Sequence, residues 1–329
     1  MMMFLDNHVR IEFDPRQSTA NQLPDFSLSA QWPKRRPESP FKEAVRCAKN
    51  IGENHSSLKL CLSGGMDSEA MALAFLEAGI PFSVAIMKLS ENLNHYDIEH
   101  AVDFCDEHQV NYEFVEIDPF TFLEKDLHLQ YDKEFLTLSP ERSIHLHFLE
   151  KVTGVPVIAG QPLQIHKVTA HPTVNSRDAR YWYFHRYLKE SNRFGIPDFH
   201  FYSPEFLLSF MFRQKEVLDF SGTSPVFSER AFQSKRNSYV EGGFPLRERA
   251  ARVAKWHGFE GLRDEINRRY GDCYFQKNYR EPMHRESGAI RFSFSGKTLQ
   301  APTTDLIEKV LFQRNLKLKE IMKNDQRSG

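Results

Sequence analysis

Residues 58–69 read Leu58-Lys59-Leu60-Cys61-Leu62-Ser63-Gly64-Gly65-Met66-Asp67-Ser68-Glu69. An apolar run ends abruptly in Ser-Gly-Gly, and a helical pattern follows, which predicts a strand, a tight loop and a helix. Two adjacent glycines let the backbone turn sharply and bring its N–H groups close to an anion, and the helix start adds more free N–H groups. The hydroxyls of Ser63 and Ser68 and the carboxylate of Asp67 complete a site that suits a phosphate chain carrying Mg²⁺.

The stretch from Ser63 to Ser68 resembles the S-G-G-x-D-S signature of the PP-loop ATP pyrophosphatases, and all five fixed positions match. Members of that superfamily cleave ATP between the α- and β-phosphates and adenylate a substrate. The resemblance implies that Ser63, Gly64, Gly65 and Ser68 bind the pyrophosphate part of ATP. It also implies that Asp67 is a catalytic residue and the metal ligand. The loop is not a Walker loop, because no Gly-Lys-Ser/Thr follows the glycines.

The composition is ordinary for a soluble globular protein. The chain has 329 residues, of which 40% are hydrophobic and 26% charged, and its net charge is −1. This charge argues against a protein that coats nucleic acid or anionic membrane. No apolar run approaches the ~20 residues of a membrane span, and the N-terminus does not resemble a secretory signal. The four cysteines are scattered, so we expect a cytoplasmic protein with no membrane partner.

Strands and helices alternate along the middle of the chain. The predicted strands are residues 58–62, 82–87, 112–117 and 155–159. The predicted helices are residues 40–51, 69–78, 97–108 and 141–152. Short links between them predict an α/β fold with a parallel sheet and helices on both faces. Ligands should gather at the carboxyl ends of the strands, which are Ser63, Lys88, Asp118 and Gly160.

Three parts are predicted along the chain. Residues 1–40 form an N-terminal appendage with a short alternating strand at residues 9–13. Residues 41–225 form the PP-loop ATP pyrophosphatase domain. Residues 226–329 form a mostly helical C-terminal region, with a charged amphipathic helix at residues 306–323.

The resemblance implies further contacts around the phosphate loop. In the superfamily the base of ATP sits against the end of the second strand, largely through backbone groups, so Met87, Lys88 and Leu89 are expected to line the ATP pocket. Gly160, after the fourth strand, is expected to bind ATP as well. Lys167 is a predicted catalytic residue that meets phosphate as a point charge. Lys235 is another, placed in a mobile basic loop that closes on pyrophosphate.

Within the superfamily the chain looks most like the synthetase domain of asparagine synthetase. The run Lys255-Trp256-His257-Gly258-Phe259-Glu260 resembles a stretch of that domain which ends in Gly-Phe-Glu. Two features depart from that enzyme. The acidic loop after its fourth strand reads Gly160-Gln161-Pro162-Leu163 here, and the chain begins Met1-Met2-Met3-Phe4 instead of with a glutaminase domain and its N-terminal cysteine. These departures argue against asparagine synthesis itself, and they imply either that ammonia comes from elsewhere or that the nucleophile is not ammonia.

The sequence therefore predicts an ATP-dependent ligase that adenylates a substrate such as a carboxylate, releases pyrophosphate and transfers the substrate to an amine or ammonia. ATP and Mg²⁺ are the expected cofactors, and the acceptor is an unidentified small molecule. Three alternatives stay open. One is sulfur transfer or sulfonucleotide reduction, for which Cys273 is the only plausible exposed thiol. Another is RNA modification, with residues 230–280 docking the RNA. The third is a nucleotide-binding module without turnover.

Charge is unevenly distributed along the sequence. Residues 91–141 contain fourteen acidic and two basic residues, whereas residues 230–280 contain twelve basic and six acidic ones. One interpretation is two solvated faces of opposite sign. The other is that the basic segment folds over the phosphates.

Overall fold

A computed structural model describes residues 9–14, 25–30, 33, 35–135, 137, 139–160, 164–167, 172–175, 183–213, 229–248, 260–271, 290–294 and 297–299. The predicted helix at residues 306–323, and residues Gln161 and Cys273, lie outside this part of the chain.

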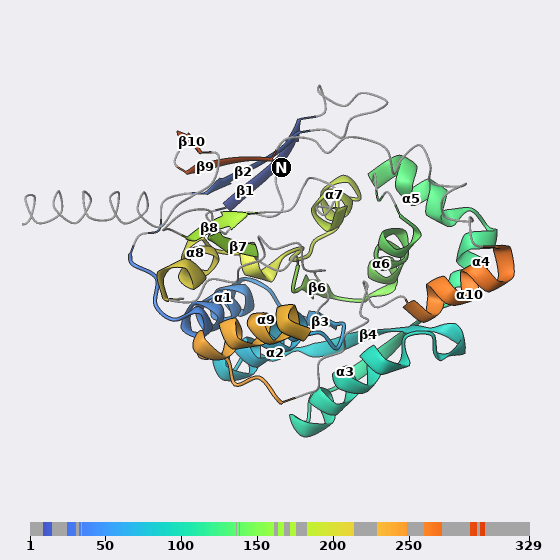
Figure 1. Ribbon diagram of the computed structural model, residues 1–329, viewed down its shortest axis with the longest axis horizontal. Helices are drawn as coiled ribbons and strands as arrows, with labels where there is room; N and C mark the ends of the chain where they lie inside the picture. Colours follow the sequence, from blue (N-terminus) through green and yellow to red (C-terminus); the bar gives the residue numbers. More distant parts are fainter. Residues whose placement is uncertain are drawn as a thin grey trace, which may run out of the picture.

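A four-stranded parallel sheet lies at the centre of the fold (Figure 1). Its strands are β3 (Leu58–Leu62), β4 (Ser83–Leu89), β5 (Tyr112–Ile117) and β6 (Val155–Ile158). The predicted parallel sheet is confirmed, and only β4 differs from its predicted bounds by more than one residue at either end. The strand order is β5-β4-β3-β6. The chain thus runs outward from β3 to β5 and then crosses back to β6, so the winding direction reverses between β3 and β6.

Helices cover both faces of this sheet, as predicted (Figure 1). The first face carries α1 (Pro40–Asn54), α2 (Met66–Ala78), α3 (His95–Glu107), α8 (Pro204–Arg213) and α9 (Glu229–Glu241). The second face carries α4 (Pro119–Glu124), α5 (Leu127–Phe135), α6 (Pro140–Lys151), α7 (Tyr183–Glu190) and α10 (Glu260–Tyr270). Strand side chains alternate between the two cores: Val84 and Ile86 pack in the first and Ala85 in the second. Burial on both faces explains why these strands are continuous apolar runs.

The helix after the phosphate loop begins earlier than predicted. Its start at Met66 follows Gly65, which occupies the N-cap position in extended conformation. Its end is as predicted, because Gly79 adopts a left-handed φ of 68° and its N–H returns to Leu76. Glycine is the residue that takes this conformation without steric cost, and it stops the helix before β4.

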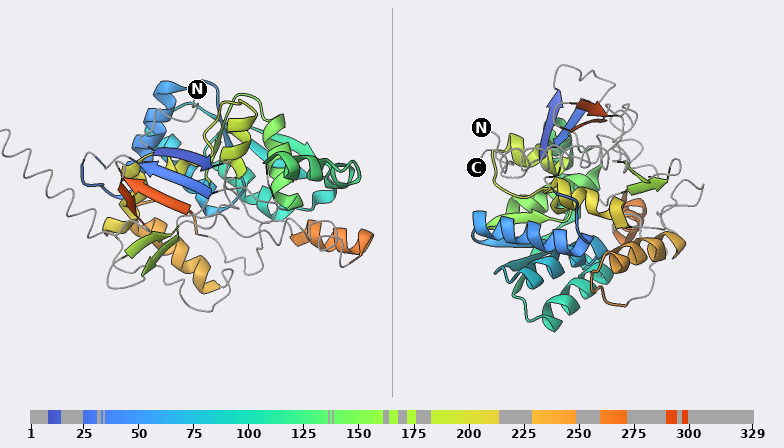
Figure 2. Two further views of the ribbon diagram at one scale, coloured as in Figure 1. Left: turned by 90° about the horizontal axis from the view of Figure 1, so that it is seen from above. Right: turned by 90° about the vertical axis from the view of Figure 1, so that its left-hand side faces the viewer.

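A second sheet joins the two ends of the described chain. Its order is β1-β2-β9-β10, with β1 at Val9–Asp14, β2 at Asp25–Ala30, β9 at Ile290–Phe294 and β10 at Lys297–Leu299. The predicted strand at residues 9–13 is confirmed. Strands β2 and β9 pair in parallel, and Figure 2 shows the blue and red strands side by side. A separate antiparallel pair consists of β7 (Gln164–Lys167) and β8 (Pro172–Asn175).

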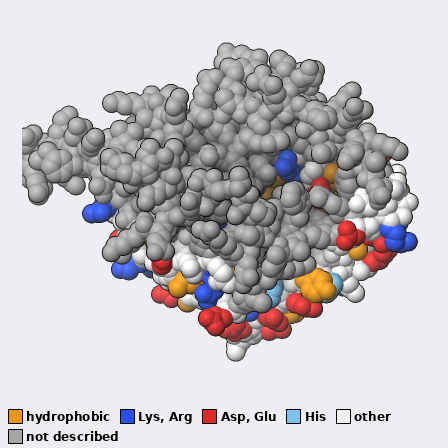
Figure 3. Space-filling view, viewed as in Figure 1, with side chains coloured by type: hydrophobic (Ala, Val, Ile, Leu, Met, Phe, Trp, Pro, Cys, Tyr) orange, Lys and Arg blue, Asp and Glu red, His pale blue; other side chains and the backbone are white. Residues whose placement is uncertain are grey.

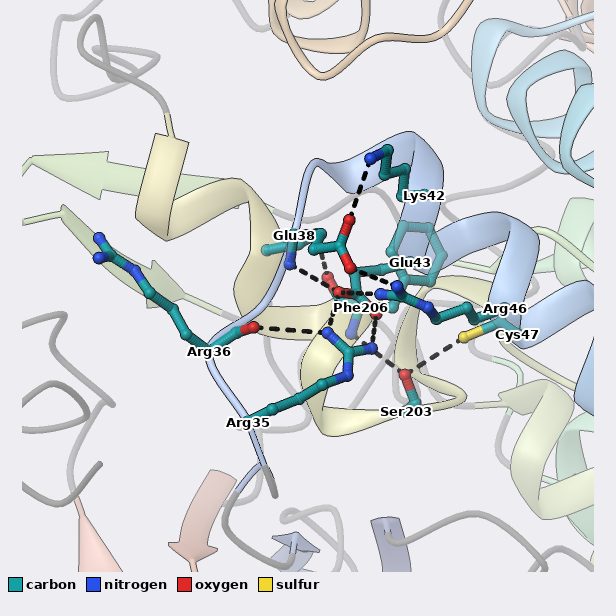
Figure 4. Close-up of polar contacts among 10 residues, drawn as sticks. Arg35, Arg36, Glu38, Lys42, Glu43, Arg46, Cys47, Ser203 and Phe206 are labelled. Carbon is teal, nitrogen blue, oxygen red and sulfur yellow. Dashed lines mark hydrogen bonds and ion pairs between the residues drawn. The ribbon is translucent and has the colours of Figure 1, made fainter. Parts of the chain in front are cut away.

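A buried carboxylate fixes the approach to α1 (Figure 4). The Glu43 side chain is 1% exposed and accepts hydrogen bonds from both terminal nitrogens of Arg35 at 2.5 Å. It also accepts from the Glu38 N–H at 2.6 Å and from Arg46 at 3.0 Å. Because a buried charge without such partners is strongly destabilising, this cluster holds residues 35–39 against α1.

The oppositely charged segments contact each other. In Figure 3, acidic side chains gather along the lower edge of the face, over α3. Arg247 lies 3.5 Å from Glu107 at the end of α3, and Arg269 of α10 donates to both carboxylate oxygens of Glu91 at 2.6 and 2.7 Å. Exposed pairs of this kind contribute little to stability, because water and salt screen the two charges. Part of the basic segment is therefore paired with the acidic one. Across the described ranges, no helix has the length and apolarity needed to cross a membrane.

Burial of His185 in α7 predicts a pH-dependent stability. Burial lowers the pKa of His185 to about 3, whereas an unfolded chain holds histidine near pKa ~6.5. The unfolded state thus binds the proton more readily, so this contribution is complete above pH 6.5 and is lost as the pH falls from 6.5 toward 3. Between pH 8 and pH 5 we expect wild type to lose about 2 kcal/mol of unfolding free energy more than His185→Asn. Urea unfolding at both pH values measures this difference, and equal losses in the two proteins would contradict it.

Candidate active site

The loop after β3 lies where the winding of the sheet reverses. In open parallel sheets the connections from the two strands at such a point leave in opposite directions and open a crevice at the carboxyl ends. Here the two strands are β3, which ends at Leu62, and β6, which ends at Ile158. Residues 63–65 follow the first and Gly160 follows the second. The topology alone therefore puts the predicted phosphate loop at the ligand-binding edge of the sheet.

The loop is held by its own hydroxyl groups. Ser68 is 2% exposed and donates to the Gly65 carbonyl at 2.9 Å, while its oxygen accepts from the Ser63 N–H at 3.3 Å. Gly64 has a φ of 67°, and a β-carbon on it would lie 2.0 Å from the backbone oxygen of Asp97 in α3. Gly65 has no side chain to cap α2, so an anion has no competitor from that position for the first-turn N–H groups.

Asp67 lies in the first turn of α2, and both of its carboxylate oxygens are bonded to α9. Its Oδ2 lies 2.5 Å from the Lys235 Nζ, and its Oδ1 accepts from the Tyr239 hydroxyl at 2.6 Å. The two partners are four residues apart on one helix face. Burial acts to raise the pKa of Asp67, but the charge of Lys235 and the hydrogen bonds from Lys235 and Tyr239 outweigh it and hold that pKa below its usual value. The carboxylate is therefore ionised at neutral pH.

Further polar contacts lead from Tyr239 to the end of β6. The Tyr239 hydroxyl lies 2.9 Å from the Nε2 of His200, whose Nδ1 lies 2.7 Å from the carbonyl oxygen of Ala159. His200 belongs to η4 (Phe199–Phe201), and the chain before it runs parallel to β6 through a bridge between Ile196 and Val157. This bridge directs η4 to the same edge of the sheet as the phosphate loop.

A carboxylate also reaches the end of β6. Gly160 has a φ of 84°, and a β-carbon on it would lie 2.0 Å from the Cγ of Asp198. Asp198 is buried, at 4% exposed. The sequence directly after β6, Gly160-Gln161-Pro162-Leu163, contains no acidic residue, so the acidic group at this point comes from a later segment.

The predicted mobile loop around Lys235 is wrong. Residues 234–236 lie inside α9. The charged residues Lys235 and Arg236 favoured a loop. However, Phe232 and Tyr239 are seven residues apart, which is two helical turns, and both contact the hydrophobic core on the first face of the sheet. Gly242 and Gly243 follow the helix and end it. Sequence reasoning missed Tyr239 for the same reason, because its spacing from Lys235 has meaning only in a helix.

The backbone groups expected to meet the base of ATP are bonded to Asn94. Its side-chain amide donates to the Met87 carbonyl at 2.8 Å and accepts from the Leu89 N–H at 2.9 Å. Lys88 lies within β4, and its amine is 3.1 Å from Glu116 of the edge strand β5. Sequence analysis did not single out Asn94, because it lies in a polar loop that carried no motif.

The structure gives partial information on two further predictions, the catalytic role of Lys167 and the sulfur-transfer alternative. The backbone of Lys167 lies in β7, paired with Pro172, and its side chain is outside the described part of the structure. For the sulfur-transfer alternative, burial raises the pKa of Cys47 and of Cys61 to about 12 and that of Cys105 to about 11. These three thiols are protonated at neutral pH, which disfavours them as nucleophiles.

The residues at the loop fit a metal ion that arrives with phosphate. Among the residues that the structure describes, no group of three or more His, Cys, Asp or Glu side chains could hold a metal ion. Mg²⁺ is commonly bound by one or two carboxylates together with substrate phosphates. Asp67 beside uncapped N–H groups matches that pattern.

Comparisons with known proteins give limited similarity. No family model and no curated protein matches this sequence. Among solved structures, NMN synthetase from Francisella tularensis is 18% identical with a TM-score of 0.27, covering 36% of this chain and 52% of that one. NH3-dependent NAD synthetase from Campylobacter jejuni subsp. jejuni NCTC 11168, in complex with the nitrate ion, is 16% identical with a TM-score of 0.28, covering 39% and 56%. The chain thus spans about half the length of each of these structures.

Proposed function

We propose that this chain is an ATP-dependent ligase of the ATP pyrophosphatase type, which forms an adenylate and releases pyrophosphate. The observation that carries the proposal is the Ser63–Ser68 loop at the reversal point of a parallel sheet, with the Asp67 carboxylate and the Lys235 amine together beside it. Backbone N–H groups, a carboxylate for a cation and a mobile amine are the parts that binding of a polyphosphate requires.

Each group has a role in this proposal. The backbone of Gly64 and Gly65 and the first turn of α2 bind pyrophosphate, with Ser63 and Ser68 shaping the loop. Asp67 holds Mg²⁺, which when bound neutralises phosphate charge. Lys235 turns from Asp67 to the leaving pyrophosphate. Further proposed contacts with ATP are Met87, Lys88, Gly160 and Lys167.

The proposed chemistry has two steps. A carboxylate oxygen of the acceptor attacks the α-phosphorus of ATP, and the bond from that phosphorus to the bridging oxygen breaks, so pyrophosphate leaves with the bond electrons. An amine or ammonia then attacks the acyl carbon of the adenylate, loses a proton and displaces AMP. The protein contributes mainly by positioning the reactants and stabilising the charge on pyrophosphate.

The base subsite involves an exchange of partners. The Met87 carbonyl has a second lone pair and can accept from a base while Asn94 stays in place, whereas the Leu89 N–H has one hydrogen and can bond a base only after the Asn94 amide releases it. In this proposal the Asn94 side chain therefore turns away from Leu89 when ATP binds. The catalytic part is residues 41–225, with Lys235 contributed by the region from 226 onward. The proposed partners are ATP and a small-molecule acceptor.

The test is incubation with ATP, Mg²⁺ and a panel of carboxylate metabolites with ammonia or amines, followed by separation of the nucleotide products. We expect AMP and pyrophosphate to appear only with the correct acceptor. Production of ADP and phosphate would reject the proposal. A salt-sensitive gel shift with RNA, together with turnover only when RNA is present, would favour the RNA-modifying alternative instead.

A further inference from the structure

We propose that Tyr239 and His200 are positioning residues that orient the Asp67 carboxylate, holding its Oδ1 so that its Oδ2 faces the phosphate site. This inference deepens the proposed function and rests on it. It concerns two side chains that carry no motif and that lie far from Asp67 in the sequence.

The first support is the continuity of the contacts. From Asp67 the chain of polar atoms passes through the Tyr239 hydroxyl at 2.6 Å and the His200 ring at 2.9 Å to the Ala159 carbonyl at 2.7 Å. Tyr239 is 5% exposed and His200 is 1% exposed. These contacts therefore link the helix that follows β3 to the end of β6, at the point where the strand order of the sheet reverses.

The second support is the placement of hydrogens. The Ala159 carbonyl can only accept, so the Nδ1 of His200 carries a hydrogen and the ring orientation is fixed. The Tyr239 hydroxyl has a single hydrogen, and it donates this hydrogen to the Asp67 Oδ1 at 2.6 Å. The His200 ring, with its Nε2 2.9 Å from the hydroxyl oxygen, packs directly against the hydroxyl and limits where it can move.

The third support is the contrast between the two carboxylate oxygens. Oδ1 accepts its hydrogen bond from the Tyr239 hydroxyl. The Tyr239 ring packs against Phe210 and Phe244, so it cannot move away from Asp67 unless α9 moves with it. Oδ2 is bonded to Lys235, whose side chain is 26% exposed and has a flexible four-carbon stem. A cation that arrives with ATP would thus replace Lys235 at Oδ2 while Tyr239 stays in place.

The experiment measures nucleotide affinity rather than turnover. An ATP analogue with a methylene group between the α- and β-phosphates is titrated calorimetrically into each protein, with Mg²⁺ and with a chelator. The ratio of the two dissociation constants is the gain in affinity from the metal ion. Hydrogen-bond partners of metal-ligating carboxylates typically affect metal affinity about 10–100-fold. We expect Tyr239→Phe to reduce the gain about tenfold or more and to leave metal-free affinity within about twofold of wild type.

The matched control is Tyr183→Phe. Tyr183 is 6% exposed, and its hydroxyl lies 3.0 Å from the Nδ1 of His145, between α7 and α6. This variant also removes a hydroxyl from a buried Tyr–His contact, and it should leave the gain from Mg²⁺ unchanged. An equal loss in both variants would show a general effect of stability and would overturn the inference.

Two substitutions of His200 separate its contacts. Asparagine can place an N–H near the Nδ1 position and keep the bond to Ala159, whereas glutamine can place its amide group near the Nε2 position and keep the contact with Tyr239. We expect His200→Gln to retain more of the gain from Mg²⁺ than His200→Asn, and this pair keeps the test available if Tyr239→Phe does not fold. The inference is wrong, while the proposed function stands, if Tyr239→Phe shows the same gain in affinity from Mg²⁺ as wild type. The same holds if the two His200 variants show equal gains. Wild type that binds no nucleotide overturns the proposed function as well.

Discussion

Asp67→Asn is expected to lower the rate of pyrophosphate release by roughly a thousandfold or more while the fold survives. The substitution keeps the size and shape of the side chain and removes its charge. Asparagine can still accept a hydrogen bond from Tyr239, but the ion pair with Lys235 is lost. The charge that would hold a cation beside pyrophosphate is lost with it, and charge stabilisation by a metal ion is worth several kcal/mol in such reactions.

A purely structural role for Asp67 predicts a different result. In the first turn of a helix an acidic residue interacts favourably with the helix dipole, an effect of about 0.3–1 kcal/mol. If that were its whole role, Asp67→Asn would be nearly silent in turnover. Thermal unfolding and pyrophosphate release should be measured on the same preparations, with Glu205→Gln in the first turn of α8 as a control for loss of charge at a helix start. Unchanged turnover in Asp67→Asn would show that the candidate site is wrong.

Gly64→Ala is expected to destabilise the protein by about 3 kcal/mol or more and to abolish nucleotide binding. Two costs combine at this position. A left-handed backbone costs a residue with a β-carbon about 1–2 kcal/mol. The new β-carbon would also lie 2.0 Å from the backbone oxygen of Asp97. Because that atom belongs to the main chain of α3, either the loop or the helix has to move.

Two other glycines separate these costs. Gly79 has a nearly identical φ of 68° with nothing within 4 Å of an added β-carbon, so Gly79→Ala should show the conformational cost alone. Gly65 has a negative φ of −87° and a nearest neighbour at 3.3 Å, the Ser63 hydroxyl. Gly65→Ala should therefore cost the least of the three. Urea unfolding gives the ranking, and a Gly64→Ala variant no less stable than Gly79→Ala would contradict the close packing of the loop on α3.

The parts of the fold that were predicted from the sequence are those set by local patterns. Strands β3 and β5 have their predicted bounds because apolar runs between turn residues are encoded within the run itself. The end of α2 at Gly79 could be predicted for the same reason, since only glycine takes a left-handed backbone at no steric cost. Asp67 and the loop were found because their residues are consecutive.

The missing parts are those that depend on contacts between distant segments. The sequence around Asp198 and His200 does not indicate that Ile196 pairs with β6. This pairing is what brings both side chains close to the phosphate loop. The parallel pairing of β2 with β9 is equally non-local. Asn94 was missed because a single amide in a polar loop looks like any turn residue, although here it satisfies two backbone groups of β4. Lys235 was predicted as a cation of the site and lies beside Asp67, but the sequence did not indicate the helix that carries it.

The separation between Asp67 and its partners has a consequence for synthesis on the ribosome. Lys235 lies 168 positions after Asp67. At about 5–20 residues per second, a nascent chain carries the phosphate loop for roughly 8–34 seconds before that lysine has been added. During this interval the carboxylate of Asp67 has neither its counter-ion nor the Tyr239 hydroxyl. The site is therefore completed late in translation, when α9 docks onto a sheet whose strands have already emerged.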